Sequence, residues 1–126
     1  MSIQLISPDT VLTPKGHYSP GVIHNGIVYV SGQLPLNKEG KAILDSIEAQ
    51  VTQCMHNIAL ILDASGSDFQ HILKVSIFIS DISFWPKVNE TFAQIMGNHK
   101  PARIVVPCKE FNYGASVEIE CIAAVK

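Results

Sequence analysis

The residues best suited to chemistry lie near the C-terminal end of the chain. Arg103 follows Pro101-Ala102 at the start of one apolar run, and Glu118 and Glu120 lie two residues apart in the last one. Arginine presents a rigid fork of N–H groups that binds a carboxylate through two parallel hydrogen bonds. Two glutamates at this spacing face the same side of a strand, where a buried carboxylate is a candidate general acid or base. A simpler alternative is that Glu118 or Glu120 pairs with Arg103 or Lys109 across a sheet.

Other common reaction centres leave no signature in the sequence. Ser31 lacks the Gly-x-Ser-x-Gly elbow of a serine nucleophile, and no glycine-rich loop is present for a phosphate. Cys54 and Cys121 fall on predicted core stripes, and Cys108 is read as a loop thiol. The histidines have no metal-ligand spacing, and surface or capping roles explain them (His17, His24, His56, His71 and His99). We therefore expect no metal.

Composition narrows the class of protein. A chain of 126 residues predicts a single domain spanning 1–126, and 16% charged residues is low enough to suggest an oligomer. The net charge is −2 without a basic cluster, so we expect neither nucleic acid nor a membrane surface as a partner. No signal peptide is visible, and three cysteines without paired spacing fit a reducing compartment. The expected location is the cytoplasm.

Local patterns predict the elements of the first half. Residues 22–24 and 27–30 read as two strands of a hairpin, because Asn25-Gly26 supplies the positive φ angles of a type I′ turn. Apolar residues at three- and four-residue spacing predict a helix over residues 47–62. Asp45 and Glu48 resemble a capping box at its start, and Gly66 is the expected stop.

The second half alternates strands with a helix. Residues 72–79 read as a strand with Leu73, Val75, Ile77 and Ile79 on one face, and a helix is expected from about residue 83 to residue 96. Strands over 103–107 and 116–125 follow, separated by a turn at 112–114, and a short strand near 3–6 is also expected. Two helices on one face of a mixed sheet make a two-layer α+β domain.

The last strand leaves part of that sheet without a cover. Val117, Ile119, Cys121 and Ala123 point one way, whereas Ile122 and Ala124 share the other side with Glu118 and Glu120. Two helices cover only one face, so the other face is apolar and exposed. We expect a homo-oligomer that packs through this face.

Several short motifs together resemble the Rid family, also called the YjgF/YER057c/UK114 family. In chain order they are Gly16-His17-Tyr18-Ser19-Pro20-Gly21, Val30-Ser31-Gly32-Gln33, Val88-Asn89-Glu90-Thr91-Phe92, Pro101-Ala102-Arg103 and Val117-Glu118-Ile119-Glu120-Cys121-Ile122-Ala123. Each is weak alone, but together they span nearly the whole chain at the family's spacing. The resemblance implies a chorismate-mutase-like α+β fold, assembled as a trimer through its sheets with active sites at the subunit interfaces.

The resemblance also implies a reaction. Members that keep the arginine hydrolyse 2-iminopropanoate and 2-iminobutanoate to 2-keto acids and ammonia without a cofactor. Carried over, Arg103 would bind the substrate carboxylate and Glu120 would position the attacking water. Tyr18 would line the pocket from a neighbouring subunit. Ser31, Gly32 and Asn89 match other positions around it. Packing explains Tyr18 equally well, and Asn89 also fits an ordinary polar helix position.

Some residues depart from the family's pattern. Val105 stands where many deaminases have a cysteine whose main-chain carbonyl helps to hold the water, a role that valine can keep. Ile104 replaces a small residue, His17 replaces a proline, and the loop over 107–114 also differs. These changes bear on substrate range more than on reaction class.

The alternative functions are a non-catalytic regulatory trimer that binds small carboxylates and a related deaminase, such as one that acts on 2-aminomuconate. Ribonuclease activity, attributed to relatives, gains no support from a chain of net charge −2.

Overall fold

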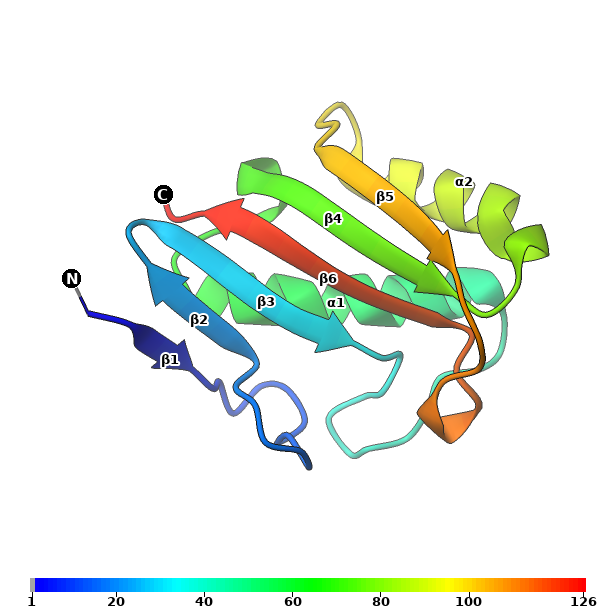
Figure 1. Cartoon of the computed structure of the whole chain (residues 1–126), viewed down its shortest axis with the longest axis horizontal. Helices are drawn as coiled ribbons and strands as arrows, with labels where there is room; N and C mark the ends of the chain where they lie inside the picture. The colour runs from blue at the N-terminus through cyan, green and yellow to red at the C-terminus, as the bar shows by residue number, and fades with distance from the viewer. Residues whose placement is uncertain (1) are drawn as a thin grey trace.

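The structure is a computed structural model that describes residues 2–126, and it consists of one mixed sheet with two helices on one face (Figure 1). In chain order the elements are β1 (Gln4–Ile6), β2 (Gly21–His24), β3 (Ile27–Gln33), α1 (Ile47–Ala64), β4 (Ile72–Ile79), α2 (Trp85–Met96), β5 (Ala102–Pro107) and β6 (Val117–Ala124). The α+β class and the order of elements predicted from the sequence are confirmed, with ends that differ by at most three residues.

The order of strands in the sheet is β1-β2-β3-β6-β4-β5. Every neighbouring pair is antiparallel except β4 and β5, which are parallel because α2 carries the chain back between them. The C-terminal strand β6 therefore lies between β3 and β4, and β5 forms one edge of the sheet. This order decides where Arg103 and the two glutamates lie.

Local turns form largely as the sequence predicts. Asn25 and Gly26 have φ angles of 53° and 76°, which confirms the hairpin between β2 and β3. Gly66 follows α1 with φ of 75°, a conformation that favours glycine at a helix C-terminus.

The predicted capping box at the start of α1 is wrong. Ser46, not Asp45, caps this helix, because its side-chain oxygen accepts a hydrogen bond from the Ala49 N–H at 3.0 Å. Ser46 is extended, with φ of −163°, so the helix begins one residue later than Asp45 requires. Glu48 remains in the first turn, where its charge favours the helix dipole.

The inward face of β4 differs from the prediction at one residue. The pairing of β4 with β6 shifts register between Ile72 and Lys74, so Ile72 is buried and Leu73 is 48% exposed. Val75, Ile77 and Ile79 are buried as expected, and they pack with the apolar stripes of α1 and α2 into one core. A local register shift reverses the side to which the residues before it point.

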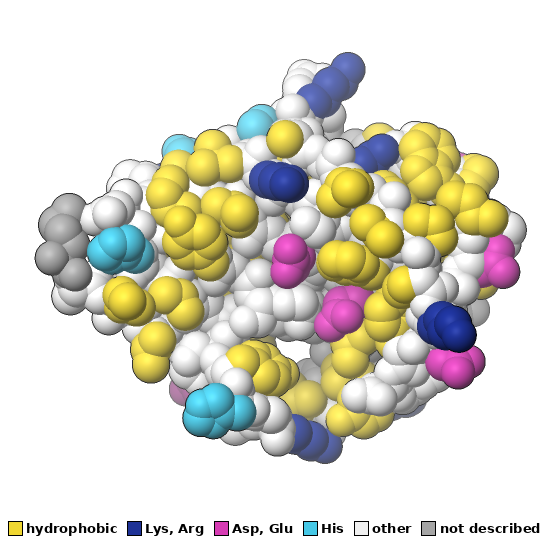
Figure 2. All heavy atoms as spheres, viewed as in Figure 1, with side chains coloured by type: hydrophobic (Ala, Val, Ile, Leu, Met, Phe, Trp, Pro, Cys, Tyr) yellow, Lys and Arg dark blue, Asp and Glu magenta, His cyan; other side chains and the backbone are white. Residues whose placement is uncertain are grey.

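The face of the sheet opposite the helices is uncovered within one chain. Figure 1 shows both helices behind the sheet, and Figure 2 shows apolar side chains over much of the front, with acidic side chains beside a hollow near its middle. Tyr29 and Ile104 are about half exposed on this face. The apolar uncovered face predicted from the sequence is thus present, while its packing against other copies remains a prediction. Across residues 2–126, no helix is long and apolar enough to cross a membrane.

Candidate functional site

Arg103 lies on the edge strand β5 and is held by side chains of α2. Its Nη1 donates a hydrogen bond to Asn89 Oδ1 at 3.0 Å. The guanidinium carbon lies 5.8 Å from the centre of the Trp85 ring and 5.5 Å from that of Phe92, distances typical of cation–π contacts. Asn89 and Phe92 follow Trp85 at positions i+4 and i+7, so one face of α2 supplies all three contacts.

The contacts that α2 makes with Arg103 leave most of the guanidinium N–H groups available to a ligand. Asn89 uses one of five N–H groups. Among the residues described, no carboxylate lies within salt-bridge distance of Arg103 or of Lys109. The simple alternative, that Glu118 or Glu120 pairs with one of these cations within the chain, is therefore not realised. A cavity of about 550 Å³ adjoins Arg103, with His99 and Lys100 also in its wall.

Ser31 and Gly32 form a bulge in β3 opposite Glu120. Val30 pairs with Cys121 and Gln33 pairs with Ile119, so two residues of β3 face the single residue Glu120 of β6. Such a bulge re-aims side chains and is frequent beside functional sites. The Ser31 hydroxyl donates to the Ser19 carbonyl at 2.6 Å, which ties the segment that carries Tyr18 to this point of the sheet.

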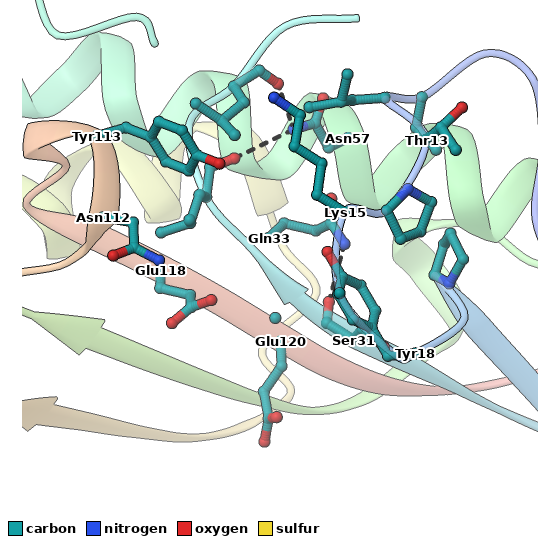
Figure 3. A pocket seen from close by; sticks show the side chains of 18 residues that line it. Thr13, Lys15, Tyr18, Ser31, Gln33, Asn57, Asn112, Tyr113, Glu118 and Glu120 are labelled. Atoms are coloured by element: carbon teal, nitrogen blue, oxygen red, sulfur yellow. Dashed lines mark hydrogen bonds between the residues drawn. The ribbon is translucent and has the colours of Figure 1, made fainter. Parts of the chain in front are cut away.

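The bulge lines a cavity of about 690 Å³ on the uncovered face of the sheet (Figure 3). The labelled side chains around it come from β3, from β6, from α1, from the segment before β2 and from the turn before β6; they include Lys15, Tyr18, Ser31, Asn112, Tyr113, Glu118 and Glu120. Asn57 of α1 supports the far wall by donating hydrogen bonds to the Leu34 and Leu36 carbonyls. The cavity thus combines fixed backbone with carboxylate, hydroxyl and amide side chains.

Glu118 is the more enclosed of the two carboxylates. It is half-buried, and a Cβ atom added to Gly32 would lie 2.8 Å from Glu118 Oε2, so the glycine leaves the space that the carboxylate occupies. Burial, and then the charge of Glu120, raise the pKa of Glu118 above the ordinary value. The sequence singled out Glu118 as a candidate acid or base, but the family resemblance gives it no role.

The predicted site residues fall into two groups on opposite faces of the sheet. Arg103 pairs with the core residue Val75 and faces the helices, whereas Glu120 pairs with Ser76 and faces the uncovered side. Asn89 and Val105 lie on the helix side with Arg103. Tyr18, Ser31 and Gly32 lie with Glu120. We call these groups the Arg103 half-site and the Glu120 half-site; one chain does not bring them together.

Neither a metal centre nor a reactive thiol is found at the two half-sites among the described residues. Within 2–126, no three or more His, Cys, Asp or Glu side chains are placed to hold a metal ion. Cys54 and Cys121 are buried in the core, which raises the pKa of both thiols. Cys108 is exposed just beyond β5, as expected for a loop thiol.

Comparison with known proteins places this chain among related sequences and folds. Residues 9–125 match the family described as Endoribonuclease L-PSP. The Reactive Intermediate Deaminase A of Arabidopsis thaliana chloroplasts is 33% identical over 123 residues, which are 97% of this chain and 66% of the plant protein. A crystal structure of YEO7 from yeast superposes with a TM-score of 0.96 at 30% identity, over 99% of this chain and 100% of that one. Escherichia coli TdcF with bound serine superposes with a TM-score of 0.91 at 26% identity, over 98% and 99% of the two chains.

Proposed function

Because the chain belongs to the endoribonuclease L-PSP family, which includes the Rid proteins, we propose that it is an imine deaminase. Its substrates in this proposal are 2-iminopropanoate and 2-iminobutanoate, which it hydrolyses to 2-keto acids and ammonia. The observation that carries the proposal is the Arg103 half-site, a guanidinium fixed by an amide and two rings with its remaining N–H groups free of any carboxylate among the residues described. The chloroplast relative named as a reactive intermediate deaminase supports the same reaction class.

Arg103 binds the substrate carboxylate in this mechanism. A planar fork matches the two carboxylate oxygens, and Asn89 fixes the plane of the fork before the substrate arrives. Trp85 and Phe92 hold the guanidinium in a partly water-excluded place, where the ion pair with the substrate is stronger than in water.

The Glu120 half-site supplies the water. An imine carbon is already electrophilic, so hydrolysis needs an oriented substrate, a placed water molecule and managed protons rather than a covalent intermediate. Glu120 orients that water and accepts a proton from it, while Ser31, Gly32 and Tyr18 shape the surrounding wall. The main-chain carbonyl of Val105 is proposed as a second contact for the water.

Only a second copy of the chain can join the two half-sites. Arg103 and Glu120 point away from opposite faces of one sheet, but β5 is an edge strand that a neighbouring chain can approach. Packing the uncovered face of one copy against the β5 edge of the next buries apolar surface and brings Glu120 of one to Arg103 of the other. We therefore propose a homotrimer with its active sites between subunits. In each site, Arg103 comes from one subunit and Tyr18 from the adjacent subunit.

Two other functions are alternatives, and only the first has no use for the water-positioning role of Glu120. A non-catalytic carboxylate-binding trimer needs Arg103 and has no need of a water-positioning carboxylate; the bound serine in Escherichia coli TdcF is one reason to test it. The cavity of about 690 Å³ also has room for a larger imine, such as one derived from 2-aminomuconate. We do not propose the ribonuclease activity in the family description, because a chain of net charge −2 has poor affinity for a phosphate backbone.

The test of the proposal is a competition assay. An amino-acid oxidase generates the iminoacid, semicarbazide traps what survives, and the purified protein is expected to suppress semicarbazone formation. Arg103→Ala is expected to abolish suppression, and Arg103→Lys to restore little of it because lysine keeps the charge but loses the fork. Lys109→Ala, which removes a cation outside both half-sites, is the matched control and keeps full suppression.

Binding can be measured apart from turnover. Arg103 is the only arginine and Trp85 the only tryptophan in the chain, and they are in contact. Titration with 2-ketobutanoate is therefore expected to change the tryptophan fluorescence of the wild type, with no change in Arg103→Ala. A folded oligomer that binds the keto acid but leaves semicarbazone formation unchanged would refute the deaminase proposal in favour of the carboxylate-binding trimer.

A further inference from the structure

Glu118 lies in the same cavity as Glu120, and we propose that it is a second catalytic carboxylate, the proton donor to the imine nitrogen. The inference rests on the proposed deaminase function and deepens it. Glu118 and Glu120 are two residues apart on β6, so both project from one face with their Cα atoms about 7 Å apart. That span leaves room for an imine group between a donor on one side and a water molecule on the other.

The surroundings of Glu118 are built to enclose a carboxyl group. Its cross-strand neighbour on β4 is the half-buried ring of Phe78, and on the β3 side it lies over Gly32. No side chain other than hydrogen fits at residue 32 without displacing Oε2, which would lie 2.8 Å from an added Cβ. The bulge therefore gives Glu118 a defined position beside Glu120.

The charged and titratable groups around Glu118 come from four parts of the chain. They are Glu120 on its own strand, Lys15 and Tyr18 from the segment before β2, Tyr113 from the turn before β6, and Cys54 beneath it on α1. Among the described residues, no Lys, Arg or His lies within salt-bridge distance of Glu118. Burial first and the charge of Glu120 second raise the pKa of Glu118. Two carboxyls in unequal environments can divide the roles of acid and base.

The two carboxyls balance the reaction and return to their starting states. In the first step the Glu118 carboxyl gives its proton to the imine nitrogen, water adds to the carbon, and the Glu120 carboxylate takes the proton that the water loses. The product is a carbinolamine, with Glu118 ionised and Glu120 protonated. In the second step Glu120 gives its proton to the amine nitrogen, the C–N bond breaks, and the hydroxyl proton passes to Glu118 as the carbonyl forms. Ammonia and the 2-keto acid leave.

The test compares Glu118→Gln with the wild type across pH in the semicarbazide assay, with the oxidase in excess at each pH. Glutamine keeps the shape but donates no proton to the imine, so kcat/KM is expected to fall by about 10²-fold or more. Wild-type kcat/KM is expected to decline as pH rises through the pKa of Glu118, and the variant to lack that decline. Binding of 2-ketobutanoate, followed by Trp85 fluorescence, is expected to stay within about twofold, because Arg103 makes the carboxylate contact.

Two further variants separate the role of the Glu118 carboxyl group from general effects of charge and position. Glu110→Gln removes an exposed carboxylate outside the cavity and is expected to leave the profile unchanged. Gly32→Ala moves the Glu118 carboxylate without removing it; it is expected to lower kcat/KM while the decline with pH persists, and to fold, since only the flexible end of Glu118 must shift. An active wild type with an equally active Glu118→Gln overturns this inference alone. A wild type that hydrolyses no iminoacid overturns the proposed function and this inference with it.

Discussion

Mixing two inactive variants tests whether Arg103 and Glu120 act from different copies of the chain. Arg103 faces the helix side of the sheet and Glu120 the uncovered side, so in the proposed trimer each active site takes one residue from each of two neighbours. Arg103→Ala chains keep Glu120, and Glu120→Gln chains keep Arg103. Co-assembled oligomers therefore contain some interfaces at which both native residues meet.

The expected activity follows from counting interfaces. In an equal mixture, half of the chains carry Arg103 and the other half carry Glu120. About one interface in four then has both residues, whatever the number of copies in a closed ring. The mixture is expected to show about a quarter of wild-type activity per chain, although each variant alone is inactive.

The assay needs exchange of subunits and a control for it. The two variants are unfolded together in urea, refolded and measured by semicarbazide competition, with light scattering to verify that the oligomer has re-formed. A parallel mixture of wild type with the Arg103→Ala/Glu120→Gln double variant is expected to retain about a quarter of wild-type activity if sites are shared, and about half if each chain has its own. An inactive mixture of the two single variants, in oligomers shown to contain both, would refute the shared site.

Three further predictions concern Trp85, Ser46 and Glu118. Trp85→Ala removes one ring from Arg103 and is expected to weaken binding of 2-ketobutanoate by roughly 2- to 10-fold, with Trp85→Phe close to wild type, as measured by calorimetry. Ser46→Ala is expected to lower the free energy of unfolding in urea by about 1 kcal/mol, whereas Asp45→Ala changes it little, because Ser46 makes the capping hydrogen bond. Glu118→Gln is expected to raise the free energy of unfolding at neutral pH, at fixed protein concentration. The folded-state pKa of Glu118 is raised, so stability falls as pH rises from the ordinary pKa of glutamate through the folded value, and the gain from glutamine disappears in acid.

Features that depend on neighbouring residues were predictable from the sequence. The hairpin turn at Asn25-Gly26, the apolar stripe of α1 and the alternation along β6 are periodic or local, and each element forms where its pattern lies. The shared face of Glu118 and Glu120 follows from the two-residue period of a strand. One local prediction was wrong: Asp45 was expected to cap α1, but the direction from which the chain enters the helix places the Ser46 oxygen at the Ala49 N–H instead.

The arrangement of the site depends on contacts between distant parts of the chain. Sequence indicates that Arg103 begins a strand, but only the sheet order places that strand at an edge and turns Arg103 toward α2, away from Glu120. Which face a strand residue occupies depends on pairing register, and a shift of one residue reverses it, as Leu73 shows. The bulge at Ser31 and Gly32 arises in the same way, from a mismatch in the pairing of β3 with β6. Long-range packing selects these registers, so the sequence alone determined the elements and their chemistry, and the tertiary structure decided that the site is divided into two halves.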